Sequence, residues 1–276
     1  MTTNEQRARV SVSTWSLHRT LGDPEFYGVG QEIPVDTHHK GASSLLELPE
    51  RIAAAGIHTL EICHFHLPTL DPVYLDELKA ALKTAQVELF SLLVDDGDVT
   101  HPRDGERDQA WISSWLRVAS ALDARCMRVI AGKSAPTPET LERSYQAVRQ
   151  LAQEAREQGI RLMTENWFEL LSTPEAVQTL LNRLEGEVGL CFDFGNWEGE
   201  DKYTRLTKIA SFAESCHAKA SFTSPFVVDG EDYTRCLDIT RQAGFAGPYT
   251  LIYAGPDDDE WQGLAIESSL VQPYVE

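Results

Sequence analysis

Short apolar runs alternate with amphipathic segments along almost the whole chain. Between the runs, apolar residues recur at steps of three and four, as in the series from Leu141 through Tyr145, Val148 and Leu151 to Ala155. Such steps predict helices, whereas compact apolar runs between turn residues predict strands. The predicted strands are Val10–Trp15, His58–Cys63, Val87–Val94, Cys126–Ala131, Ile160–Glu165, Val188–Asp193, Ser215–Ala220 and Tyr249–Tyr253.

Turn and capping residues separate these elements. Gly56 and Gly159 precede strands, and the run Ser172-Thr173-Pro174-Glu175 has the capping residue and proline that open a helix. Eight strand–helix units in 276 residues suit a (β/α)8 TIM barrel, which typically has about 250 residues. No Gly-rich dinucleotide fingerprint follows the first strand, which argues against a doubly wound sheet. We predict an α/β protein with a single barrel domain over residues 1–276.

Two segments, 16–44 and 94–110, are too long to be simple turns between a strand and its helix. In a (β/α)8 barrel both would lie at the C-terminal face, where binding and catalytic loops are found. We therefore expect them to border the functional site.

The charge of the chain excludes some partners. With 24 basic and 43 acidic residues the formal net charge is −19, which argues against nucleic acid and anionic membrane surfaces. The five cysteines form no CxxC pair and are expected to be reduced, buried thiols. The N-terminal MTTNEQRARV lacks the apolar core of a signal peptide, and no apolar run reaches the roughly 18 residues that span a bilayer. We expect a soluble, cytoplasmic protein.

Three ionisable side chains stand at the ends of successive predicted strands. Glu165, Asp193 and His217 end strands five, six and seven. Adjacent strands lie about 4.8 Å apart, so these side chains can converge above the barrel. Two carboxylates and one imidazole suit one divalent metal ion, Mn, Mg, Co or Zn. Each residue alone is equally explained as a helix cap or a partner of arginine, but together they predict a metal site.

Several further residues are candidates for contact with a substrate. Lys219 follows His217 by two positions, so both point into the barrel mouth, where Lys219 acts as a base or an electrophile or pairs with Glu165 or Asp193. Arg128 and Lys133 either meet an anionic group or pair with surface acids. The aromatic and histidine candidates, for which core packing is the alternative, are Trp15, His18, His64, His66 and Trp167.

The motifs around these residues resemble one family along nearly the whole chain. They are Thr164-Glu165-Asn166-Trp167, Asp193-Phe194-Gly195-Asn196-Trp197 and His217-Ala218-Lys219, with weaker similarity at Ser13 to His18, Leu60-Glu61 and Asp95 to Asp98. The chain resembles the xylose isomerase-like TIM barrels of the sugar phosphate isomerase/epimerase family, related to D-tagatose 3-epimerase-type enzymes and endonuclease IV. The resemblance implies one divalent metal held by Glu, Asp, His and Glu from strands five to eight, the two glutamates exchanging a proton with the substrate.

The resemblance fails at the last strand. Ile252 occupies the position of the fourth ligand, and Ala254 stands where a second acid is often found. An isoleucine neither coordinates a metal nor accepts a proton, so the ion is expected to be weakly bound or absent. Asn196 replaces the substrate-binding histidine of many sugar epimerases and becomes a candidate substrate contact.

We interpret the chain as a metal-dependent sugar or sugar-phosphate isomerase/epimerase-like enzyme that acts through an enediolate. Glu165 serves as ligand and base, Asp193 and His217 serve as ligands, and Lys219 assists. Two alternatives stay open. One is a carbon–oxygen lyase, or dehydratase, acting on a keto-sugar or cyclitol, and the other is a non-catalytic barrel that binds a sugar or metabolite. The expected partner is a small sugar, sugar phosphate or cyclitol, and a homo-oligomer is left open.

Overall fold

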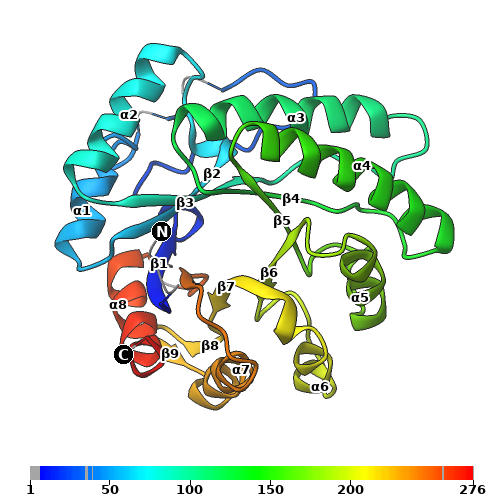
Figure 1. The fold of residues 1–276 in the computed structure, drawn as a ribbon. Helices are drawn as coiled ribbons and strands as arrows, with labels where there is room; N and C mark the ends of the chain where they lie inside the picture. Colours follow the sequence, from blue (N-terminus) through cyan, green and yellow to red (C-terminus); the bar gives the residue numbers. More distant parts are fainter. Residues whose placement is uncertain (1–6, 35–36, 39, 257, 276) are drawn as a thin grey trace, which may run out of the picture.

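The computed structural model describes residues 7–34, 37–38, 40–256 and 258–275. Eight parallel strands close into a barrel in the order β1-β10-β7-β6-β5-β4-β3-β2 (Figure 1). The predicted (β/α)8 barrel is confirmed, and each predicted strand overlaps one observed strand. The strands are β1 (Arg9–Ser13), β2 (Thr59–Cys63), β3 (Glu88–Val94), β4 (Cys126–Val129), β5 (Arg161–Glu165), β6 (Gly189–Asp193), β7 (Ala213–Lys219) and β10 (Pro248–Ile252).

The helices form a ring outside the barrel (Figure 1). The predicted start of one helix is observed, because the Thr173 hydroxyl accepts the N–H of Ala176 and Pro174 occupies the first helical turn. The helices are α1 (Leu48–Ala54), α2 (Pro72–Thr84), α3 (Gly105–Ala121), α4 (Pro138–Glu157), α5 (Pro174–Arg183), α6 (Lys202–Thr207), α7 (Gly230–Gln242) and α8 (Glu260–Val271). Two short 3-10 helices, η4 (Ala210–Phe212) and η5 (Gln272–Tyr274), complete this layer.

The strand register brings the candidate residues to one level at the C-terminal end of the barrel. Asp193 on β6 lies opposite His217 on β7, and Lys219 lies opposite Ile252 on β10. The pairing of β1 with β10 closes the barrel. The ends of β5, β6, β7 and β10 are therefore neighbours around one opening.

Two strands pass directly into 3-10 helices, and one of them, β1, ends two residues earlier than predicted. β1 stops at Ser13, and Trp15 lies in the 3-10 helix η1 (Thr14–Leu17). β2 stops at Cys63, whose N–H donates to the Thr14 hydroxyl, and the chain turns into η3 (His64–His66). A small antiparallel hairpin of β8 (Phe222–Ser224) and β9 (Val227–Val228) follows β7. It was not predicted because strands of three and two residues are too short to produce a periodic pattern.

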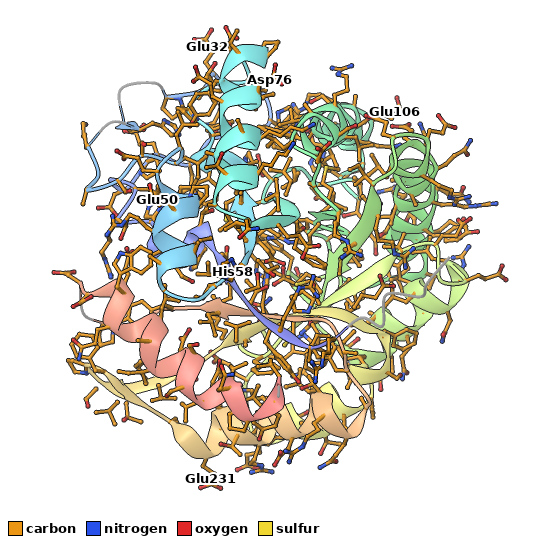
Figure 2. The ribbon with its side chains drawn as sticks, turned by 60° about the vertical axis from the view of Figure 1, so that its left-hand side comes forward. Glu32, Glu50, His58, Asp76, Glu106 and Glu231 are labelled. Carbon is orange, nitrogen blue, oxygen red and sulfur yellow. The ribbon has the colours of Figure 1, made fainter. Side chains whose placement is uncertain are left out.

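The acidic excess lies on the outside of the molecule. The labelled carboxylates of Glu32, Glu50, Asp76, Glu106 and Glu231 project from the surface and are exposed (Figure 2). All five cysteines are free and buried, as the sequence predicted. None of the helices in the described residues is long and apolar enough to cross a membrane.

Candidate active site

A cavity of about 310 Å³ opens at the C-terminal end of the barrel. We call it the inner cavity. Aromatic and aliphatic side chains form much of its wall, including Phe26, Phe168 and Ile252. Apolar walls with a few converging polar groups are typical of small-molecule sites. Eight candidate residues predicted from the sequence line it: Trp15, Arg128, Glu165, Trp167, Asp193, Asn196, His217 and Lys219.

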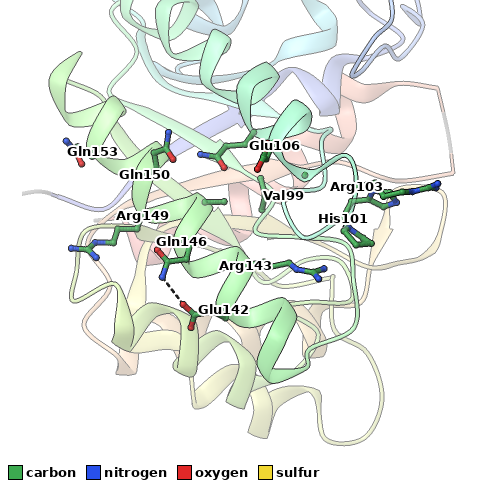
Figure 3. A pocket seen from close by; sticks show the side chains of 14 residues that line it. Val99, His101, Arg103, Glu106, Glu142, Arg143, Gln146, Arg149, Gln150 and Gln153 are labelled. Atoms are coloured by element: carbon green, nitrogen blue, oxygen red, sulfur yellow. Dashed lines mark hydrogen bonds between the residues drawn. The ribbon is translucent and has the colours of Figure 1, made fainter.

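A larger hollow of about 750 Å³ lies between α3 and α4 on the outside of the barrel (Figure 3). Its wall consists mostly of long polar side chains such as Arg103, Glu106 and Gln146, which are exposed. Gln146 donates to Glu142 over 2.7 Å within the hollow. Because its ionisable groups face solvent and do not converge on one point, we place the candidate active site in the inner cavity.

The carboxylates of Glu165 and Asp193 both approach one ring nitrogen of His217. Nδ1 of His217 lies 3.5 Å from Oε1 of Glu165 and 3.7 Å from Oδ2 of Asp193. All three side chains are buried. The strand ends thus bring together the three residues that the sequence placed there, with two carboxylates facing a single imidazole nitrogen.

Glu61 holds the other nitrogen of the same ring. Its Oε2 lies 2.8 Å from Nε2 of His217, and Glu61 is fully buried on β2. A carboxylate at Nε2 favours the N–H on that nitrogen and directs Nδ1 toward Glu165 and Asp193. No role was predicted for Glu61 from the sequence, although an acid inside the buried strand β2 indicates a buried partner.

The position of His217 favours a cation at Nδ1. Burial alone would lower the pKa of His217, but Cys191, Glu165 and Glu61 around it raise that pKa well above its usual value. Either a proton or a metal ion at Nδ1 satisfies the two carboxylates that face this nitrogen.

Arg128, near the end of β4, is buried beside Glu165. Its Nε lies 3.1 Å from Oε2 of Glu165, and its Nη2 lies 2.6 Å from Oδ1 of Asp95. The guanidinium carbon lies 5.3 Å from the ring centroid of Trp167. The sequence predicted for Arg128 either a contact with an anionic group or an ion pair at the surface. The structure gives an internal pair instead, while Lys133 pairs with the half-buried Asp96.

The two carboxylates of the cluster differ in acidity. Burial favours the neutral form of Glu165, but the charges of His217 and Arg128 outweigh it and lower its pKa to about 2. Burial and the neighbouring Glu165 raise the pKa of Asp193 to about 6. Asn196 connects them, because its side-chain amide donates to Glu165 over 2.7 Å and its backbone N–H donates to Asp193 over 2.6 Å. Glu165 is therefore fully ionised at neutral pH.

The donor atoms fit a divalent metal ion. Ligand atoms of Glu165, Cys191 and His217 all lie within 4.8 Å of one another. Within the described residues, Oε2 of Glu165 accepts no hydrogen bond, and its close partner is the Arg128 guanidinium at 3.1 Å. Burial raises the pKa of Cys191 to about 11, so its sulfur remains a thiol and is a weaker ligand than the Asp193 carboxylate. Ile252, which is 5% exposed, supplies no donor at the fourth position.

Lys219 differs from Arg128 in its surroundings. It is partly exposed, and no carboxylate of the described residues lies within ion-pair distance of its ammonium group. Its stem packs on Gly195, where an added Cβ would lie 2.7 Å from Cδ of Lys219. The neighbouring glycine thus leaves room for an amine at the cavity wall.

Three predicted substrate contacts lie outside the inner cavity. His64 and His66 are buried in η3, and their ring nitrogens bond to the Tyr27 carbonyl and the Thr14 hydroxyl. His18 bonds through Nδ1 to Nε2 of His66 over 2.9 Å. Because β2 ends at Cys63, His64 and His66 lie in η3 and not on a strand that reaches the inner cavity. His18, in the loop after β1, lines a neighbouring cavity instead.

Comparisons with solved structures support the fold. A xylose isomerase-like TIM barrel protein from Mycobacterium smegmatis in complex with magnesium is 15% identical, with a TM-score of 0.67 and coverage of 99% of this chain and 98% of that chain. The D-psicose 3-epimerase with D-tagatose from Clostridium cellulolyticum H10 is 15% identical, with a TM-score of 0.70 and coverage of 98% and 99%. The probable 3-DHS dehydratase AsbF from Bacillus anthracis is 12% identical, with a TM-score of 0.68 and coverage of 95% and 98%.

No curated protein sequence matches this chain. The model of one protein family does match it, over residues 49–269, which is most of the barrel and includes all the residues of the Glu165–Asp193–His217 cluster. The chain belongs to the xylose isomerase-like TIM barrel family.

Proposed function

We propose that this protein is a metal-dependent enzyme of the isomerase/epimerase type, which removes a proton next to the carbonyl group of a keto-sugar or related polyol. The observation that carries the proposal is the approach of Glu165 and Asp193 to the same nitrogen of His217, at 3.5 and 3.7 Å. Proteins of similar structure include a D-psicose 3-epimerase and a probable 3-DHS dehydratase, which supports a small polyhydroxylated substrate.

Glu165, Asp193 and His217 would hold the ion, Mn, Mg, Co or Zn, and the Cys191 sulfur lies within 4.8 Å of ligand atoms of Glu165 and His217. When bound, the ion supplies a Lewis acid that polarises the carbonyl and lowers the free energy of the enediolate. Glu61 orients His217 for this role. Ile252 offers no donor at the fourth position, so substrate oxygen or water would have to complete the coordination, and we expect weak binding of the metal.

Glu165 accepts the proton in this proposal. With a pKa of about 2 it is always ionised at neutral pH, but such a weak base removes a carbon-bound proton only when the carbonyl is strongly polarised. Aldose–ketose isomerisation suits the site, since one carboxylate can remove the proton and return it to the adjacent carbon. Epimerisation needs a second proton donor on the opposite face of the substrate, and Lys219 is the candidate for it.

A second candidate is dehydration, which the apolar Ile252 favours. In that reaction Glu165 takes the proton beside the carbonyl, the electron pair of the C–H bond forms a C=C bond, and the C–O bond to the β-hydroxyl breaks. The Lys219 ammonium gives its proton to the departing oxygen, so that water leaves. Only one carboxylate base is needed, in agreement with the absence of an acid at position 252.

The test is proton–deuterium exchange in D₂O, followed by NMR, after separate loading with Mn, Mg, Co or Zn. The substrates are ketoses, inosose-type cyclitols and their phosphates. We expect exchange with at least one of them, lowered about 100-fold or more in Glu165→Gln. Glu169→Gln, a change at an exposed acid nearby, serves as the control. Absence of exchange together with substoichiometric metal would contradict the proposal and favour a non-catalytic sugar-binding barrel.

A further inference from the structure

A second cavity, of about 290 Å³, adjoins the inner cavity. We call it the outer cavity. Trp15 and Phe26 line both cavities, so the two adjoin at these side chains. The outer cavity is otherwise formed by groups from the β1 loop and the end of β10, among them His18, Asp23 and Ala254. No residue of the metal-ligand cluster lines it.

An aromatic ridge divides the two cavities. Trp15 is 41% exposed and Phe26 is 56% exposed, although both lie above a buried aromatic layer. The centroid of Phe26 lies 5.7 Å from that of Trp15 and 4.1 Å from that of the fully buried Phe65. Rigidly supported aromatic rings left open to solvent beside a cavity indicate a surface for stacking on a ligand.

Polar groups flank this ridge on the outer side. The ring of His18 is nearly parallel to that of Trp15, at 23°, and its Nε2 lies 3.8 Å from Oδ1 of Asp23. The Asp23 side chain is 66% exposed and can accept hydrogen bonds. Arg19 also lines the cavity, and its Nε lies 3.6 Å from Oδ1 of Asp258, so the cation on this wall already has a carboxylate beside it. Hydroxyl groups beside an apolar ring face match this arrangement of paired charges better than an anionic ligand does.

The wall of the outer cavity is well supported. The carboxylate of Glu260 accepts the backbone N–H groups of Arg19 and Thr20 at 2.8 and 2.9 Å, which fixes the loop after β1. The Tyr253 ring packs so closely on Gly263 that an added Cβ there would lie 2.1 Å from it. The cavity is therefore bounded by packed and hydrogen-bonded groups on both sides.

We propose that the outer cavity binds a second, neutral sugar ring, so that the preferred substrates are glycosylated keto-sugars. The reacting ring occupies the inner cavity, the linkage crosses the ridge, and the attached ring stacks on Trp15 and Phe26. This rests on the proposed function for the identity of the reacting ring, but the outer site is a matter of binding and can be measured without turnover. The two cavities together roughly double the volume of the inner one.

Binding of matched ligands tests this inference. D-fructose is compared with turanose and isomaltulose, in which the same ketose carries a glucose ring, by titration calorimetry on the metal-loaded protein. We expect at least one two-ring ligand to bind about tenfold or more tightly than D-fructose. Two-ring ligands that bind no more tightly than D-fructose would overturn the inference.

Two variants test whether the second sugar ring binds in the outer cavity. Ala254→Trp fills the outer cavity from an exposed position, and Phe26→Ala removes half of the ridge. We call the ratio of the affinity for a two-ring ligand to the affinity for D-fructose the two-ring advantage. Each variant should reduce it to about twofold or less. Val73→Ala, which shortens another exposed apolar side chain on α2, should keep it. An advantage that survives in both Ala254→Trp and Phe26→Ala would place the second ring elsewhere.

The two proposals fail in different ways. If the two-ring advantage is present and sensitive to Ala254→Trp but no carbon-bound proton exchanges, the outer site stands and the proposed function is wrong. If exchange occurs and the advantage is absent, the proposed function stands and the outer site is wrong.

Discussion

On the side of the barrel mouth formed by β4 to β7, charged side chains are buried against one another, whereas the side formed by β1 and β10 presents aromatic and aliphatic surface. On the first side, Arg128 and His217 lie 2.6 to 3.5 Å from the carboxylates of Asp95, Glu165 and Glu61. Trp15 and Ile252 line the second. The contrast suggests that one side supplies fixed charge for chemistry and the other supplies shape for binding.

The charged side should be the more sensitive to loss of a single partner. Arg128→Met would leave Asp95 and Glu165 buried without their cation, and we expect a loss of about 3–5 kcal/mol in the free energy of unfolding. The matched control, Lys133→Met, breaks the pair with Asp96, in which both side chains are about one third exposed, and should cost about 1 kcal/mol or less. Urea unfolding of both variants measures the difference, and equal losses would contradict it.

On the apolar side, the corresponding change is the addition of a charge. Ile252→Glu places a carboxylate at a position that is 5% exposed, and we expect it to lower the free energy of unfolding by at least about 2 kcal/mol. Metal affinity and proton exchange should not rise, since the neighbouring wall is apolar. Ile252→Met, which conserves volume, should cost less than about 1.5 kcal/mol. A clear gain in both metal affinity and exchange would restore the two-glutamate epimerase interpretation.

Replacing Glu61 tests whether this residue orients the ring of His217 on the charged side. Glu61→Gln should weaken metal binding about 10- to 100-fold, because the neutral amide holds the Nε2–H of His217 less firmly. Calorimetric titration with Mn and the ¹⁵N shifts of the His217 ring report affinity and tautomer separately. Glu88→Gln, at the partly exposed partner of Arg9, should leave both unchanged. Unchanged affinity in Glu61→Gln would show that His217 is oriented by other contacts.

The smallest expected effect concerns an acid behind the apolar side. Glu267 on α8 is fully buried, and burial raises its pKa well above the usual value. Because the pKa is higher in the folded state, stability is fully present below the unfolded pKa and is lost as pH rises toward the folded one. As pH rises above the unfolded pKa, Glu267→Gln should therefore gain stability relative to the unaltered protein, by at most about 1.4 kcal/mol per pH unit. Parallel pH dependences of urea unfolding would contradict this.

The sequence predicted the barrel and the three strand-end residues because both follow from local pattern. A strand in a parallel barrel is a compact apolar run, and its last residue necessarily reaches the C-terminal face. The proximity of Glu165, Asp193 and His217 could therefore be predicted before any strand pairing was known. The role of His64 and His66 could not be predicted, because it depends on the path that the chain takes after Cys63.

Glu61 and Arg128 show where local pattern stops being sufficient. The contact between Glu61 and His217 joins residues 156 positions apart, across the interior of the barrel. It depends on how β2 and β7 are placed around the closed sheet, and no feature near either residue specifies that placement. The sequence is equally compatible with a surface or a buried position for Arg128, and only the positions of Asp95 and Glu165 beside it decide between them.

The sequence by itself determined the (β/α)8 fold, the level of Glu165, Asp193 and His217 at the strand ends, and the absence of an acid at position 252. Only the tertiary structure decided which nitrogen of His217 faces the carboxylates, where Arg128 places its charge, and that Trp15 and Phe26 separate two cavities. The physical reason is the distance along the chain between the residues that interact. Periodicity and strand-end position are properties of neighbours along the chain, whereas charge compensation and cavity shape arise from side chains that meet only after the barrel has closed.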